Sequence, residues 1–219
     1  MLIECSESIS WFASIREQWE KIHIEIAEKF DNEDGPFRHT ELTQVSMLAG
    51  AVVRAGGLAF EEFQGQKNGA DSLGERRSPK RKSPTGRVDL GFFFNEEFYL
   101  AEAKLQCPNL LAAKQNPIDD ALKAIKESVS DTEKSLRGFR DEKYPFPARG
   151  LAVTFLLPHF LKDKEKIAQE KLASYEAKLV AAARSKGVDL IASLIIKPGW
   201  LNKEKNHLYS RLYMLIKEV

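Results

Sequence analysis

Two strand-length runs of almost entirely apolar residues constrain the fold of this 219-residue chain more than any other feature. They cover residues 149–157 (RGLAVTFLL) and 188–196 (VDLIASLII). A strand with one solvated face alternates apolar and polar residues, whereas a continuous apolar run is typical of a strand that is covered on both faces. We therefore expect helices on both sides of a central sheet.

Four stretches have the periodicity of helices that could cover such a sheet. They are residues 7–30, 41–55, 116–139 and 162–186, and the third can be read as one helix or as two pieces that separate near residue 130. Further strands are expected at 58–63, in a hairpin within 86–104 and at 208–219. This order of elements predicts an α/β layered fold with a mixed central sheet flanked by helices.

Composition places the chain among soluble globular proteins and favours one domain over residues 1–219, with residues 1–35 as an N-terminal helical extension. Two cysteines are too few for a disulfide framework, and no run approaches the length of a membrane span, so we expect a cytoplasmic protein that does not enter a membrane. The N-terminus lacks the basic and apolar regions of a signal peptide. The formal net charge is only +1, so any affinity for nucleic acid must come from a local patch.

The stretch GRVDLGFFFNEEFYLAEAK predicts two strands joined by a tight turn, and it carries three charges among apolar residues. A two-residue turn that starts at Asn95 pairs Asp89 with Glu102, and a turn that starts at Glu96 pairs Asp89 with Lys104. Either register predicts that the three charged side chains share one face, because side chains alternate along a strand. Carboxylates on paired residues repel each other unless a cation joins them, and Mg²⁺ typically binds one or two carboxylates. The alternative is a buried salt bridge of Lys104 with one acid, which leaves the other acid unexplained.

The order of Asp89, a short hairpin and Glu102-Ala103-Lys104 resembles the PD-(D/E)xK nuclease superfamily, which has the restriction-endonuclease-like fold. The resemblance implies that Asp89, Glu102 and the carbonyl of Ala103 bind Mg²⁺, with Mn²⁺ as an alternative ion. It implies that Lys104 positions the attacking water and stabilises charge on the phosphate. Members often carry a proline before the aspartate, and Val88 stands there in this chain.

Many members of that superfamily add a glutamate from a helix that precedes the hairpin, and Glu41 fits this role. It lies four residues before Val45 and seven before Leu48, on the stripe of its helix that is expected to face inward. We therefore expect Glu41 to be an auxiliary metal ligand or a base. The alternative is an acid that the helix dipole favours at an N-terminus. Gln106 continues the face of Lys104 and is expected to contact the water or the DNA backbone.

Residues 64–87 predict a long loop in which seven cations face only two acids. The cations are Lys67, Arg76, Arg77, Lys80, Arg81, Lys82 and Arg87. A cationic segment that leads directly into Asp89 is suited to capture a phosphate polymer. The alternative is a solvated linker, which is what most charge runs are.

These features predict a Mg²⁺-dependent DNA endonuclease that hydrolyses phosphodiester bonds, of the restriction or phage-defence type. The alternatives are a non-catalytic nucleic-acid-binding module of the same fold and an RNA-directed nuclease, and a role in DNA repair stays open. DNA is expected as the partner ahead of RNA. Restriction-like enzymes often pair to cut both strands, so the resemblance also implies a homodimer as an option. The chain has no glycine-rich phosphate loop, so it gives no support to ATP or NAD binding.

Overall fold

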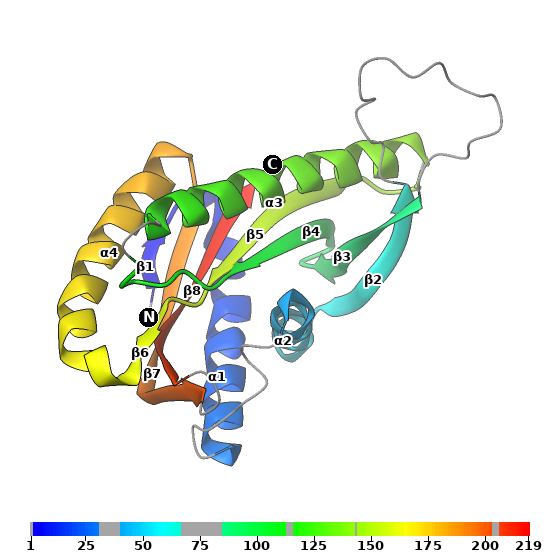
Figure 1. Ribbon diagram of the computed structural model, residues 1–219. Helices are drawn as coiled ribbons and strands as arrows, with labels where there is room; N and C mark the ends of the chain where they lie inside the picture. Colours follow the sequence, from blue (N-terminus) through cyan, green and yellow to red (C-terminus); the bar gives the residue numbers. More distant parts are fainter. Residues whose placement is uncertain (1, 31–39, 67–84, 113–115, 143, 203–205) are drawn as a thin grey trace.

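One mixed sheet organises the computed structural model, which describes residues 2–30, 40–66, 85–112, 116–142, 144–202 and 206–219. Its strands are β1 (Leu2–Cys5), β2 (Leu58–Gln66), β3 (Thr85–Phe94), β4 (Glu97–Gln106), β5 (Ala148–Leu156), β6 (His159–Leu161), β7 (Leu190–Asn202) and β8 (His207–Glu218). They follow the order β1-β7-β8-β5-β4-β3-β2, and β6 pairs with β8 (Figure 1). Strands β4 and β5 are parallel, and the other pairs are antiparallel.

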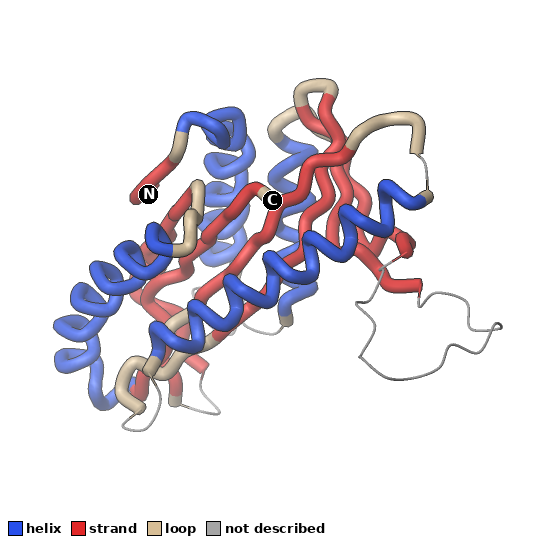
Figure 2. The backbone as a smooth tube through the Cα atoms, turned by 90° about the horizontal axis from the view of Figure 1, so that it is seen from above, coloured by secondary structure: helices blue, strands red, loops and turns tan. Residues whose placement is uncertain are grey.

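Helices cover both faces of this sheet, as the two apolar runs predict. The helices are η1 (Glu7–Phe12), α1 (Ala13–Lys29), α2 (Glu41–Arg54), α3 (Pro117–Asp141), η3 (Lys162–Lys164) and α4 (Glu165–Ser185). Helices α1 and α2 lie on one face, and α3 and α4 lie on the other (Figure 2). In β5, Phe155 packs against Trp19 of α1, while its neighbour Leu156 belongs to the apolar cluster that includes Leu179 of α4. None of the helices in the described part of the chain is both long and apolar enough to cross a membrane.

Two short strands differ from the sequence-based expectation, and the expected loop over 64–87 is shorter at both ends, because residues 64–66 belong to β2 and residues 85–87 belong to β3. Strands β1 and β6 have four and three residues, and they form only because β7 and β8 offer neighbouring backbone groups. The stretch expected as one or two helices is a single helix, Pro117–Asp141. The segment expected as an extension contributes β1 to the sheet and the fully buried Phe12 and Trp19 to the core.

The turn between β3 and β4 starts at Asn95, which confirms the first of the two predicted registers. Phe94 pairs with Glu97, and the ladder runs back to the pair of Leu90 with Ala101. Asn95 and Glu96 have φ values of 49° and 66°, as expected for a two-residue turn whose twist matches that of the strands. In this register, Asp89 and Glu102 follow directly after the last pair of the ladder.

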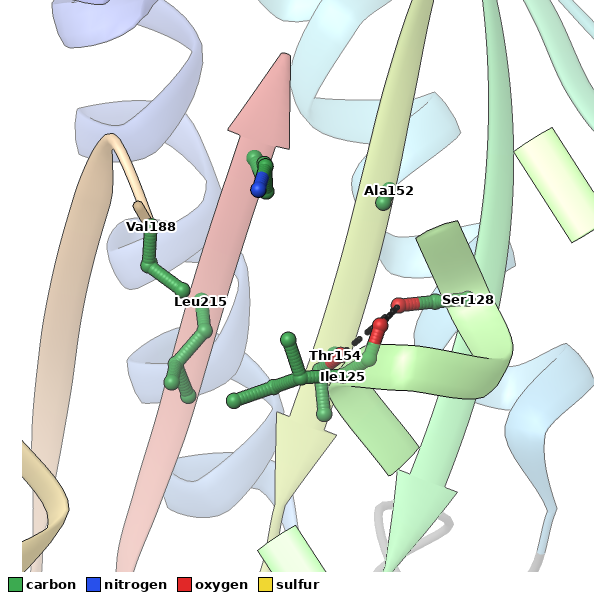
Figure 3. Close-up of a pocket in the computed structure, with 7 residues that line it drawn as sticks. Ile125, Ser128, Ala152, Thr154, Val188 and Leu215 are labelled. Carbon is green, nitrogen blue, oxygen red and sulfur yellow. Dashed lines mark hydrogen bonds between the residues drawn. The ribbon is translucent and has the colours of Figure 1, made fainter. Parts of the chain in front are cut away.

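Helix α3 connects β4 to the parallel strand β5 and lies close against the sheet. Small hydroxyl residues line its buried face, and Ser128 lies 3.1 Å from the hydroxyl of Thr154 on β5 (Figure 3). The hollow that these residues border with Leu215 holds essentially no free volume, so it is packing rather than a ligand site. A Cβ at Gly150 would come within 2.6 Å of Leu136 and 2.7 Å of Thr132, so this glycine permits the close approach.

We therefore expect Gly150→Ala to lower the free energy of unfolding by about 1–3 kcal/mol, because the added methyl group must displace α3. Gly50→Ala is the matched control, since its Cβ would meet Ile22 at an ordinary 3.4 Å within a helix. Urea unfolding of both variants checks this. Equal stability of the Gly150→Ala variant and the wild type would contradict the packing described here.

Buried His23 joins α1 to α2 and makes stability depend on pH. Its Nδ1 lies 2.8 Å from the Trp19 carbonyl oxygen, and its Nε2 lies 3.2 Å from the Gln44 side-chain amide. Burial lowers the pKa of His23 from 6.5 to about 4, although both hydrogen bonds oppose the shift. The ring is therefore neutral in the folded protein at a pH where the unfolded chain already binds a proton.

The contribution of His23 to stability is consequently complete above the ordinary pKa of 6.5 and is lost as the pH falls toward 4. The His23 contribution to this loss is roughly 3 kcal/mol. Urea unfolding between pH 7 and pH 4 should show a steeper loss for the wild type than for the His23→Gln variant. Parallel pH profiles of the two proteins would contradict the assignment.

Candidate active site

The sheet opens where β3 separates from β4. The pairing of these strands ends at Leu90 and Ala101, and beyond that point β3 pairs only with β2. Leu90 packs in the core under α1 and α2, whereas Val88 packs with Leu136 of α3 on the other face. Two residues that are two positions apart would share a face in a regular strand, so the alternation is interrupted at Asp89. The interruption leaves an edge of β4 without a strand partner.

Two carboxylates take the place of the missing strand along this edge. The N–H of Ala103 donates to Oδ2 of Asp89 at 2.8 Å, and the N–H of Leu105 donates to Oε2 of Glu41 at 3.1 Å. Backbone donors inside a protein need partners, so each acid completes the hydrogen bonding of β4. Glu41 reaches the edge because α2 begins there, after Thr40 caps its N-terminus by accepting from the N–H of Thr43.

Lys104 connects the two layers of helices at the same opening. Its Nζ lies 3.2 Å from Oδ2 of Asp131 on α3 and 3.9 Å from Oε1 of Glu41 on α2. Asp131 also accepts from Lys134 at 2.9 Å through its other oxygen. Because α2 and α3 lie on opposite faces, one ammonium contacts both only where the sheet has opened.

Glu102 lies deeper, beneath α3. Its side chain is 1% exposed, and its Oε1 accepts from the hydroxyl of Ser135 at 2.5 Å. The structure therefore brings Glu41, Asp89 and Lys104 together at the opening and holds Glu102 under the helix. The expectation of one shared face assumed unbroken alternation along β3, and the turn of the chain at Asp89 departs from it.

A cavity of about 280 Å³ opens beside Glu41 and Asp89. Its lining residues are Thr40, Glu41, Leu42, Val45, Glu62, Arg87 and Asp89. Arg87 lies at this cavity and donates to Glu62 at 2.5 Å, while its side chain stays 63% exposed. The other six predicted nucleic-acid contacts, Lys67, Arg76, Arg77, Lys80, Arg81 and Lys82, lie outside the described residues. Gln106 is half-buried at the end of β4, and its carbonyl accepts from the N–H of Leu157.

The charges of the opening shift one another's proton affinity. Burial raises the pKa of Glu41, and the nearby Asp89 and Asp131 add to this, although Lys104 and the Leu105 N–H oppose it. Burial alone would lower the pKa of Lys104, but the Glu41 and Asp131 carboxylates raise it above the ordinary value. Burial would raise the pKa of Asp131, yet Lys134 and Lys104 bring it below the usual range. Lys104 is therefore a firmly protonated cation.

The oxygen atoms at the opening suit a hard divalent cation. Asp89 and Glu41 each use one carboxylate oxygen for a backbone N–H, and the carbonyl of Ala103 leaves the same edge of β4 as its N–H. Within the described ranges, no group of three or more His, Cys, Asp or Glu side chains is arranged to hold a metal ion. Of the predicted ligands, buried Glu102 is the least open to a solvated ion.

Sequence reasoning missed two residues of α3 that contact the motif, Asp131 and Ser135. A signal was present, since both lie on the inward stripe of the helix together with Ser128 and Thr132. Polar residues on a buried stripe usually have a specific partner.

In comparisons with known proteins, no family model, curated protein or solved structure matches this chain.

We expect Glu41→Gln to stabilise the folded protein at neutral pH. The raised pKa of Glu41 means that the folded state favours its protonated form, so its contribution to stability is present below the unfolded pKa and is lost as the pH rises. Glutamine keeps an acceptor for the Leu105 N–H and removes the charge.

Thermal unfolding should give a higher Tm for the variant at pH 7.5, and the difference should shrink toward pH 4. Glu170→Gln, on the exposed surface of α4, is the control and should match the wild type at both pH values. A variant that is less stable than the wild type at pH 7.5 would contradict the expectation.

Proposed function

We propose that this chain is a metal-dependent nuclease that hydrolyses phosphodiester bonds in DNA. The observation that carries the proposal is the convergence of Glu41, Asp89 and Lys104, from three different elements, on the place where β3 leaves β4. A purely structural network would not require that the two acids which bind the edge of β4, Glu41 and Asp89, also line a cavity. Two carboxylates beside one protonated lysine suit the binding of a cation next to an anionic phosphate.

Different residues of the chain would bind the metal ion and position the phosphate. Asp89, Glu41 and the Ala103 carbonyl would hold Mg²⁺ or Mn²⁺, and Glu102 would support them from beneath α3. A bound Mg²⁺ supplies Lewis acidity and lowers the pKa of its water. Lys104 stays protonated beside Glu41 and Asp131, so it would donate to a phosphate oxygen and orient the scissile group rather than accept a proton.

The order of elements supports assignment to the restriction-endonuclease-like fold and the PD-(D/E)xK superfamily. A helix that carries Glu41 precedes the hairpin, and the second hairpin strand carries Glu102-Ala103-Lys104. Helix α3 and a strand parallel to β4 then follow. Six further cations lie between β2 and β3 in the sequence, and Arg87, which follows them, lines the cavity. This concentration of positive charge in the sequence favours a polyanion as the ligand.

One observation favours a non-catalytic binding module as the second candidate. Glu102 is 1% exposed and accepts from Ser135, so a main ligand of the expected metal site is turned to the interior. In this alternative, the buried acid belongs to the packing of α3, and the basic segment alone binds nucleic acid.

A cleavage assay separates these candidates. Supercoiled plasmid, linear duplex DNA and single-stranded RNA are each incubated with the protein in Mg²⁺, Mn²⁺ or EDTA. We expect DNA cleavage that requires the metal, and a loss of at least about 100-fold in Asp89→Asn and Lys104→Met, because each removes a group next to the reacting phosphate.

The matched controls are Glu170→Gln and Lys171→Met, which change exposed residues of α4 and should cleave like the wild type. Cleavage of RNA alone would reassign the substrate. Salt-sensitive DNA binding with no turnover in any metal would support the binding module and overturn the nuclease proposal.

A further inference from the structure

We infer that α3 positions both charged groups of the Glu102-Ala103-Lys104 motif, through Asp131 for the ammonium and through Ser135 for the carboxylate. The inference rests on the proposed function, because it assigns these two residues to the handling of a cation at the same site. Neither residue is part of the motif that the sequence displays. They act through Lys104 and Glu102, so they are positioning residues.

The spacing of the two contacts explains why one helix can make both. Lys104 and Glu102 are two residues apart on β4, which separates them by roughly 6.6 Å along the strand. Asp131 and Ser135 are four residues apart on α3, which separates them by about 6 Å along the helix and leaves them on one face. The contacts pair 104 with 131 and 102 with 135, so the helix runs antiparallel to β4 and both contacts form in register.

Helix α3 is held in place by contacts that do not involve Glu102 or Lys104. Thr132 donates to the carbonyl of Ser128 at 2.8 Å and lies 3.3 Å from the carbonyl of Leu151 on β5. Gly150 lets the helix approach β5 more closely than a Cβ would permit. Asp131 is also fixed from its own helix, because Lys134 occupies its other oxygen. The position of the Asp131 carboxylate therefore follows from packing rather than from Lys104.

Asp131 and Glu41 compete for the same ammonium. Nζ of Lys104 lies 3.2 Å from Asp131 and 3.9 Å from Glu41, so the ammonium is drawn toward α3. Without Asp131, the flexible lysine would move onto Glu41 and Asp89 and neutralise the carboxylates that border the cavity. Asp131 thus keeps the lysine beside the cation site but away from the ligands, and Ser135 fixes the direction of the Glu102 carboxylate.

The test measures the binding of Mn²⁺ alone by calorimetry, with no nucleic acid present, in a double-mutant cycle of Asp131→Asn and Lys104→Met. We expect Asp131→Asn to weaken binding by about 10-fold, in the range found for residues that orient metal ligands. In the Lys104→Met background the same change should alter the affinity by no more than about 2-fold, because the competing ammonium is gone. The Asp131→Glu variant keeps the negative charge and should bind Mn²⁺ with the affinity of the wild type.

Two further variants complete the design. Ser135→Ala should also weaken Mn²⁺ binding, but equally in both backgrounds, because it acts through Glu102 and not through Lys104. Glu133→Gln changes an exposed acid on the same helix and should leave the affinity unchanged. Thermal unfolding of every variant establishes that it is folded before its affinity is compared.

The outcomes separate the inference from the proposed function. An equal loss from Asp131→Asn in both backgrounds, or no loss in either, overturns the role of Asp131 even if the wild type cleaves DNA. The expected cycle in a protein that cleaves no nucleic acid supports the inference about the cation site and overturns the nuclease. A wild type that binds no Mn²⁺ overturns the inference.

Discussion

The separation of β3 from β4 after Leu90 and Ala101 is the feature on which the rest of the site depends. A continuous ladder would consume the N–H groups of Ala103 and Leu105 in strand pairing and would leave no place for a carboxylate. Because the ladder stops, these donors take Asp89 and Glu41 as partners. At the same place, Lys104 of β4 contacts helices on both faces of the sheet.

The end of the β3–β4 pairing explains why residues from opposite layers meet. Helices α2 and α3 are separated by the sheet along most of its area, so side chains from the two cannot touch there. At the opening, the long side chain of Lys104 lies within reach of Glu41 from one layer and Asp131 from the other. Gly150 permits α3 to pack close against the sheet, and this brings Asp131 within reach of Lys104 on β4.

The cluster is arranged for charge rather than for stability. Burial raises the pKa of Glu41, and the nearby Asp89 and Asp131 add to this, although Lys104 opposes the shift. Natural proteins tend to keep such unfavourable groupings at functional sites, where the ligand later compensates the charge. The buried hydrogen bond between Ser135 and Glu102 differs in kind, because it removes an acid from solvent and ties α3 to the strand that carries the motif.

The sequence by itself determined the layered α/β arrangement and most of the element boundaries, and it limited the hairpin to two registers, of which the structure has the one that turns at Asn95. These follow from local patterns: continuous apolar runs, helical periodicity, the Thr40 cap and the turn at Asn95. It also singled out Asp89, Glu102 and Lys104 as charged residues in apolar surroundings. Glu41 was singled out by the resemblance to a nuclease superfamily and by its position on the inward stripe of its helix. The sequence could not show the roles of Asp131 and Ser135, since they depend on how α3 crosses β4.

Only the tertiary structure determined where the side-chain alternation that predicted a common face for Asp89 and Glu102 is interrupted. The alternation of side chains is a local rule, and it predicted one common face for Asp89 and Glu102. Long-range packing overrode that rule, because Val88 joins the cluster under α3 while Leu90 stays in the core under α1 and α2. The resulting turn at Asp89 sends one acid to the strand edge, and the hydroxyl of Ser135 holds the other in the interior.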